Sequence, residues 1–278
     1  PDGIFARFLA GDAPLLAVIG DSGHGKTNLL CALRGSPEAR PDAESQGALF
    51  LECSTIGSGG LEAQFDDRFN QTGALAALVA HLREHPDRRV ILFLDGLNEY
   101  ARPRALLQEI LQLVSRAPNL RVVTTCRTVA WQTTTQNLVF DEELLFRPGG
   151  KEPVLSQFDP AELEAAYPRY QEAFHLTTAH DDLSPEARRL LRDPLLLRLA
   201  AQAYHDAAIP RDPDIQALFH NYERERKLHP QRDVALLEEL VAVMWRRGVD
   251  QLPKAYTADS PALEALVYED PVVSSGDA

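Results

Sequence analysis

The chain has 278 residues, of which 45% are hydrophobic and 25% are charged, a composition typical of globular proteins. Its net charge of −13 comes from 41 acidic and 28 basic residues and argues against broad, non-specific nucleic-acid binding, which needs a basic surface. No apolar run approaches the roughly 20 residues of a membrane span, and Cys31, Cys53 and Cys126 are too widely spaced for a zinc site or a disulfide framework, which favours a reducing, cytoplasmic location.

Short apolar runs in the first half of the chain predict buried strands. These runs are residues 14–19, 48–51, 89–94 and 120–125. Apolar runs without polar alternation are typical of parallel strands that helices cover on both faces. Helical patterns lie between the runs, at residues 28–33, 75–84 and 104–116. The alternation predicts an α/β domain over residues 1–147, with a parallel sheet and right-handed crossovers.

The first predicted strand runs into a glycine-rich segment, residues 20–27, that matches the P-loop pattern G-x-x-x-x-G-K-[ST]. Glycines let the backbone wrap closely around phosphate, and the N–H groups of the following helix start attract the negative charge. Lys26 is expected to reach the β- and γ-phosphates, and the Thr27 hydroxyl to bind Mg²⁺. The alternative is a glycine-rich turn that matches by chance. The predicted nucleotide-binding residues here are Gly20, Asp21, Ser22, Gly23, His24, Gly25, Lys26, Thr27 and Asn28.

Polar residues follow the third and fourth predicted strands. Asp95 ends the third strand, where a carboxylate lies beside a P-loop and can hold the metal, although a plain Asp-Gly turn would look the same. Glu99 is the candidate base or water-orienting residue; alternatively, it is an acidic residue at a helix start. Arg127 follows the fourth strand and is a candidate sensor of the γ-phosphate, with a surface cation as the alternative.

The second half of the chain reads as helical. Residues 146–151 resemble a linker, and helix starts with a capping residue followed by proline come after them, at Asp159, Ser184 and Asp193. A further helix is predicted over residues 233–247, where an apolar stripe ends in a basic turn and a glycine.

These motifs, in this order, resemble a NACHT-type P-loop NTPase of the STAND class of signalling ATPases. Residues 20–27 are similar to the family's Walker A motif, residues 93–99 to its extended Walker B motif, and residues 125–127 to its sensor 1. Pro194 lies in a segment similar to the family's proline motif, which implies packing against the adenine; the alternative is an ordinary helix-start proline. The resemblance implies a helical domain over residues 152–210 and a winged-helix-like domain over residues 211–278.

The resemblance also implies a function. Family members switch from a closed ADP state to an open, oligomerising ATP state, and they carry an effector and a repeat-based sensor. The family architecture implies that an effector precedes Pro1 and a repeat-based sensor follows Ala278, and a start at Pro rather than Met also suggests a piece of a longer protein. The Asp-x-Leu-Asn-Glu variant around Asn98 resembles prokaryotic antiviral STAND proteins.

Two departures from the family pattern matter. Asn98 is an amide where the family usually has an acid, which predicts slow hydrolysis. The winged-helix histidine that meets the β-phosphate in some relatives has only His220 and His229 as weak candidates.

Several rival functions remain to be compared. The chain lacks the Asn-Lys-x-Asp guanine reader of a GTPase and an arginine-rich lid of a P-loop kinase in its first half. Residues 58–64 faintly resemble a transporter signature but lie before Asp95, so a flexible loop is expected there. The alternatives left open are a turnover ATPase of the motor type and a nucleotide-bound scaffold without hydrolysis.

Overall fold

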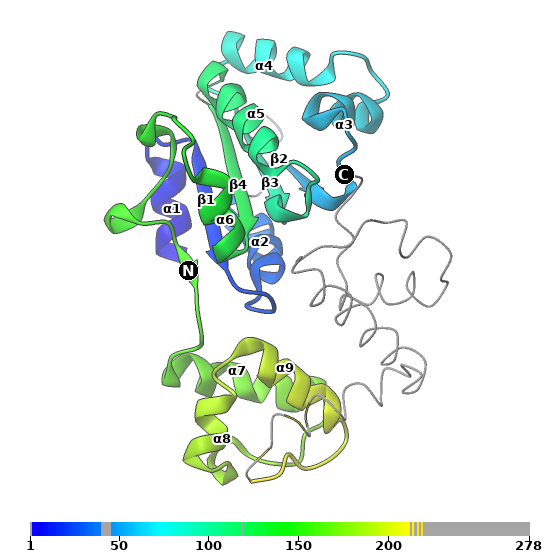
Figure 1. Cartoon of the computed structure of the whole chain (residues 1–278), viewed down its shortest axis with the longest axis vertical. Coiled ribbons are helices and arrows are strands. Elements are labelled where there is room, and N and C mark those ends of the chain that lie inside the picture. Colours follow the sequence, from blue (N-terminus) through cyan, green and yellow to red (C-terminus); the bar gives the residue numbers. More distant parts are fainter. Residues whose placement is uncertain are drawn as a thin grey trace, which may run out of the picture. The chain divides into compact units, whose positions relative to one another are not determined.

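The computed structural model describes residues 2–39, 46–117 and 119–211, together with Pro213, Gln216 and Leu218 (Figure 1). The chain divides into two compact units, Pro1–Ser156 and Gln157–Ala278. In the described part of the chain, no helix is both long enough and apolar enough to cross a membrane.

The first unit is built on a five-stranded parallel sheet with the order β2-β3-β4-β1-β5. The strands are β1 (Leu15–Gly20), β2 (Gln46–Glu52), β3 (Arg89–Asp95), β4 (Leu120–Cys126) and β5 (Val154–Leu155). The four predicted strands and their parallel arrangement are confirmed. Because the strands are parallel, the ends of β1, β3 and β4 that carry the predicted site residues lie at the same edge of the sheet.

Helices cover both faces of this sheet (Figure 1). They are α1 (Asp2–Ala10), α2 (Lys26–Gly35), α3 (Gly60–Phe69), α4 (Ala74–Glu84), α5 (Pro103–Arg116) and α6 (Thr128–Thr135). In β3, Ile91 and Phe93 pack in the cluster formed with α1 and α2, whereas Leu92 and Leu94 pack in the cluster formed with α3 to α6. The absence of polar alternation in the strands therefore has a structural reason, since both faces are buried.

The prediction of a flexible loop at residues 58–64 is wrong, because helix α3 begins at Gly60. Leu61 and Phe65 on this helix are buried in the core. The Leu61 N–H donates to the Glu109 carboxylate on α5 at 3.0 Å, which ties the start of α3 to its neighbour. A Cβ at Gly60 would lie 2.7 Å from the same carboxylate, and the residue has a φ of +71°. Glycine therefore permits the close approach that begins the helix.

The segment read as a linker, residues 146–151, belongs to the first unit. The Phe146 ring packs edge-on against Phe8 with 5.6 Å between ring centroids, and the Phe146 N–H donates to the Leu15 carbonyl at 2.7 Å. The chain then enters β5, which pairs with the end of β1. The sheet unit consequently extends to Ser156, further than the boundary at residue 147 that the alternation of strands and helices predicts.

The second unit contains α7 (Pro160–Ala173), α8 (Pro185–Leu190) and α9 (Pro194–Ala203). All three predicted helix starts are confirmed. Asp159 and Glu162 form a reciprocal capping box with two bonds of 2.8 Å, and Ser184 and Asp193 also accept hydrogen bonds from the first turns of their helices. The predicted helix at 233–247, the winged-helix-like domain apart from its first residues, and His220 and His229 lie outside the described residues.

Candidate functional site

The loop between β1 and α2 is shaped for an anion. Gly23 and Gly25 have φ values of +78° and +79°, a left-handed conformation that side chains disfavour. Gly25 is the N-cap of α2 and supplies no side chain to bond the N–H groups of the first helical turn. These N–H groups and the helix dipole make the start of α2 attractive to phosphate.

Strand β5 contacts this loop and supports its backbone. A Cβ at Gly20 would lie only 2.9 Å from the Leu155 carbonyl oxygen and 3.1 Å from the Leu155 Cβ, so the two backbones touch. His24 lies in the loop, and its Nδ1 is 3.1 Å from the same carbonyl oxygen. A strand that the sequence did not predict therefore fixes both ends of the Gly20–His24 segment.

Lys26 holds its ammonium group against the loop. Its Nζ donates to the Gly20 carbonyl at 2.9 Å and to the Asp21 carbonyl at 2.7 Å, which uses two of its three N–H groups. Burial, followed by repulsion from Arg127, lowers the pKa of Lys26, and the nearby Asp95 carboxylate opposes this shift. Lys26, Arg127 and Asp95 thus form one electrostatic group, as expected if they serve one ligand.

Asp95 is held by two hydroxyl groups from different elements. Thr27 Oγ1, at the start of α2, donates to Asp95 Oδ2 at 2.6 Å. Thr125 Oγ1, at the end of β4, donates to Asp95 Oδ1 at 2.6 Å and accepts the Gly96 N–H at 2.8 Å. The sequence places Thr125 in the sensor 1 motif but indicates no role for its hydroxyl. Its partner is 30 residues away in the chain, so only the pairing of β3 with β4 brings the two together.

The donor set around Asp95 suits magnesium. Mg²⁺ prefers hard oxygen ligands and is usually held by one or two carboxylates together with substrate phosphates and water. Among the described residues, no group of three or more His, Cys, Asp or Glu side chains is placed to hold a metal ion. A magnesium ion that accompanies a nucleotide needs no such cage, because Thr27 and Asp95 supply protein oxygens and the phosphates supply the others.

Asn98 and Glu99 follow in a short 3-10 turn, Leu97–Glu99. The Asn98 side-chain oxygen accepts the backbone N–H of Arg127 at 2.9 Å and so fixes the junction between β4 and α6. The Glu99 side chain is exposed and lies back over Gly96, where an added Cβ would come within 2.7 Å of its carboxyl carbon. Burial, with Asp95 and Glu99 adding to it, raises the pKa of the Cys53 thiol, so the carboxylates share one neighbourhood.

The predicted site residues fall into two groups. Those of the P-loop, with Asp95, Glu99 and Arg127, lie in the first unit at the carboxyl ends of β1, β3 and β4. Pro194 lies in the second unit, where it is the buried first residue of α9 after the Asp193 cap. A helix-start role accounts for its position there, and its adenine role stays a prediction.

Comparison with known proteins gives the site a context. A family model described as the NACHT domain matches residues 14–148. Among solved structures, the chain is similar to a Walker-type ATPase of Pyrococcus abyssi, at 16% identity and a TM-score of 0.51, with 87% of this chain and 75% of that chain covered. No curated protein matches the chain.

Two further structures resemble the chain more weakly. Cdc6p of Pyrobaculum aerophilum matches at 17% identity and a TM-score of 0.49, with 73% of this chain and 59% of that chain covered. The Orc1 protein of Aeropyrum pernix, solved in complex with DNA, matches at 17% identity and a TM-score of 0.47, with 84% and 65% covered. At these identities the comparison with the Pyrococcus protein concerns the fold alone.

Proposed function

We propose that this chain is the switch module of a STAND signalling protein, because the NACHT family model matches residues 14–148 and implies a nucleotide-binding ATPase module. It binds ATP or ADP with Mg²⁺ and hydrolyses ATP slowly. The observation that carries the proposal is the joining of three elements at one carboxylate, where Thr27 and Thr125 each donate to Asp95 at 2.6 Å beside the P-loop.

This geometry supports a role for each of the site residues. The backbone of residues 20–28 and the Lys26 ammonium hold the phosphates, while Thr27 and Asp95 hold the metal. Magnesium, when bound, neutralises phosphate charge. Thr125 acts on Asp95 and positions its carboxylate, since both Asp95 oxygens accept from a fixed hydroxyl. We expect Pro194 to pack against the adenine, as the family resemblance implies.

Hydrolysis depends on Glu99, Arg127 and Asn98. Glu99 orients the attacking water or accepts its proton. The Arg127 guanidinium responds to the γ-phosphate, which its electrostatic coupling to Lys26 supports. Asn98 accepts the Arg127 N–H without adding a negative charge, whereas the acid usual at this position in the family would add one. This difference supports slow turnover, as in a switch, over rapid turnover, as in a motor.

The switch itself rests on the γ-phosphate, which only the ATP state contains. A ligand shifts a two-state equilibrium by its differential affinity for the two states, and a few kcal/mol moves a minor state to dominance. Contacts of the γ-phosphate with Lys26, Arg127 and Mg²⁺ supply part of that difference. In the full-length protein, the ATP state self-associates and activates an effector after a sensor is triggered, in antiviral defence.

Nucleotide binding and turnover test this proposal. Calorimetry with MgATP and MgADP should show binding to the wild-type chain and strongly weakened binding to Lys26→Ala, while thermal melting confirms that the variant is folded. Unchanged ATP affinity in Lys26→Ala would contradict the P-loop assignment.

Turnover separates the proposed switch from its two alternatives. Wild-type protein should hydrolyse ATP slowly, and Glu99→Ala should stop hydrolysis while leaving ATP binding intact. Rapid, sustained turnover by the purified protein would favour a motor ATPase. Equal and undetectable turnover in wild type and Glu99→Ala would favour a nucleotide-bound scaffold.

A further inference from the structure

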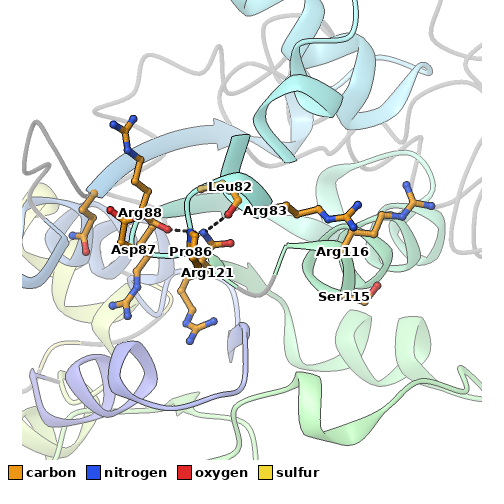
Figure 2. Close-up of a pocket in the computed structure, with 11 residues that line it drawn as sticks. Leu82, Arg83, Pro86, Asp87, Arg88, Ser115, Arg116 and Arg121 are labelled. Atoms are coloured by element: carbon orange, nitrogen blue, oxygen red, sulfur yellow. Dashed lines mark hydrogen bonds between the residues drawn. The ribbon is translucent and has the colours of Figure 1, made fainter. Parts of the chain in front are cut away.

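A pocket of about 820 Å³ lies at the opposite end of the sheet from the P-loop (Figure 2). It is formed where β2, β3 and β4 begin and where α4 and α5 end, and residues from all five elements or from the turns next to them line it. Strand β3 runs from this pocket at Arg89 to the nucleotide site at Asp95, a distance of about 20 Å at the usual rise per residue. The pocket is therefore separate from the P-loop site.

Arginine dominates the lining of this pocket. Five guanidinium groups surround it, and Asp87 is the one acidic residue among the described residues that line it. In Figure 2, Arg83 and Arg116 lie on one side of the pocket, and Arg88 and Arg121 lie on the other. We call this set the arginine pocket: Arg83, Arg88, Arg89, Arg116 and Arg121. Such a concentration of positive charge is unexpected in a chain with a net charge of −13.

The arginines come from both faces of the sheet. Arg121 is opposite Ile91 in the register of β4 and β3, and Ile91 packs in the core beneath α1 and α2. Arg83 and Arg116 lie in the last turns of α4 and α5, which cover the other face. A ligand at the edge of the sheet can therefore contact guanidinium groups on both sides.

Hydrogen bonds fix the walls of the pocket. The Asn119 side-chain amide donates to the carbonyls of Leu82, His85 and Arg88 at 2.8, 3.1 and 2.6 Å, and so fastens the turn between α4 and β3 to the start of β4. Arg121 is 8% exposed and donates to the Gly11 carbonyl at 2.8 Å. The backbone that forms the base of the pocket and the Arg121 side chain are thus held in place, and the exposed Arg83 and Arg116 side chains stand at its rim.

The positive charges also act on one another. Burial, followed by repulsion from Arg89, lowers the pKa of Arg121, although Asp12 opposes the shift. In the described part of the chain, Arg83, Arg89 and Arg116 form no ion pair. Because neighbouring guanidinium groups such as those of Arg89 and Arg121 repel one another, they gain most from an anion that contacts several of them at once.

We propose that the arginine pocket binds a small molecule carrying two or more phosphate groups. Guanidinium forks match phosphate geometry bidentately, and the volume is within the range of small-molecule sites. None of the described residues that line the pocket is aromatic, whereas single-stranded nucleic acid is held by aromatic stacking. The composition of the lining favours a compact polyphosphate over an oligonucleotide.

Calorimetry with inorganic tripolyphosphate in magnesium-free buffer tests the proposal on the whole chain. The double variant Arg83→Ala/Arg116→Ala should bind tripolyphosphate at least about tenfold more weakly than wild type, because each charge-assisted contact is strong. Both side chains are exposed at helix ends, so thermal melting should show a folded protein. The single variants Arg83→Gln and Arg116→Gln provide the same test if the double variant does not fold.

A matched control has the same change in net charge. Arg169→Ala/Arg189→Ala removes two exposed arginines from α7 and α8 in the second unit and should leave tripolyphosphate affinity unchanged. Equal losses in both double variants would overturn the proposal, because a general charge effect would then explain them. The absence of binding to wild type, or unchanged binding to Arg83→Ala/Arg116→Ala, would also overturn it.

Two further titrations separate this site from others. If Lys26→Ala removes tripolyphosphate binding and the arginine variant does not, the anion binds the P-loop and the proposal is wrong. If a hexaglutamate peptide binds the wild-type chain as tightly as tripolyphosphate, the pocket recognises carboxylates and the phosphate assignment is wrong. Since Lys26→Ala tests the proposed function and the arginine variants test this pocket, either proposal can fail without the other.

Discussion

At the scale of single residues, the placement of the Asp95 carboxylate depends on Thr125. Thr125 is 1% exposed, and its hydroxyl donates to Asp95 and accepts from the Gly96 N–H. Thr125→Val keeps the shape but leaves a buried N–H and one carboxylate oxygen without this partner. The free energy of unfolding should fall by about 1–3 kcal/mol, and Mg²⁺-dependent ATP binding should weaken. Chemical denaturation and calorimetry measure the two effects.

The neighbouring Thr124 is a matched control for this substitution. Its side chain is fully buried, and its hydroxyl has no hydrogen-bond partner in the described part of the chain. Thr124→Val should therefore leave the stability unchanged or raise it, because a buried hydroxyl without a partner is unfavourable. If the two valine variants lose equal stability and affinity, the hydrogen bonds of Thr125 do not have the role we assign.

Arg127 gives a second prediction at this scale. Only ATP contains the γ-phosphate, so Arg127→Ala should weaken ATP binding by about tenfold or more and ADP binding much less. The control is Arg104→Ala, an exposed arginine of the same unit that donates to the Gln136 carbonyl, and it should leave both affinities unchanged. Equal losses of ATP and ADP affinity in Arg127→Ala would remove its sensor role.

Residue roles were predictable where one local pattern contained them. Lys26 and Thr27 belong to a contiguous motif, and Asp95 ends an apolar run. A parallel sheet brings the carboxyl ends of its strands together, so the proximity of these residues was predictable. The bond between Asn98 and the Arg127 backbone joins residues 29 apart, and only the structure shows it. The arginine pocket combines residues of four elements and one turn, none of which carries a motif, so composition alone did not predict it.

At the scale of elements, the P-loop depends on the two-residue strand β5. The Gly20 Cα touches the Leu155 backbone so closely that a Cβ would lie 2.9 Å from its carbonyl oxygen. Gly20→Ala should therefore push β5 away from β1, lower the unfolding temperature and weaken nucleotide binding. Thermal melting with and without MgADP measures both consequences in one experiment.

Gly35, in the last turn of α2, is the control for Gly20. A Cβ at this position meets nothing within 4 Å among the described residues, so Gly35→Ala should be neutral or slightly stabilising, as alanine favours helix. A Gly20→Ala variant that melts and binds nucleotide like Gly35→Ala would show that β5 gives the loop no support.

The elements that the sequence failed to predict have weak local signals. Strand β5 has only two residues, and Val154 is exposed, so no buried run marks it. Helix α3 has glycine at its N-cap, Gly59, and at its first position, Gly60, where glycine gives little helix signal, and it is stabilised by the Glu109 carboxylate from α5. In contrast, the helix starts at Asp159 and Asp193 were predictable because the caps and prolines that make them are local in sequence.

At the scale of the whole molecule, the two units have separate cores. Leu92 is buried in the sheet core of the first unit, and Leu197 is buried in the helical core of the second, each at most 1% exposed. The sequence changes from alternating strands and helices in its first half to only capped helices in its second half, and this change predicted the division. The position of the boundary depended on β5, which composition did not reveal.

Separate cores predict separable unfolding. Leu92→Ala and Leu197→Ala remove the same atoms from the two cores, and each should destabilise its own unit by about 2–5 kcal/mol. Differential scanning calorimetry should show that the two variants lower the temperatures of different unfolding transitions. Because the described P-loop site lies in the first unit, MgADP should raise the temperature of the unfolding transition that Leu92→Ala lowers. If both variants lower one shared transition to the same extent, the units unfold as a single cooperative body and nucleotide binding stabilises both.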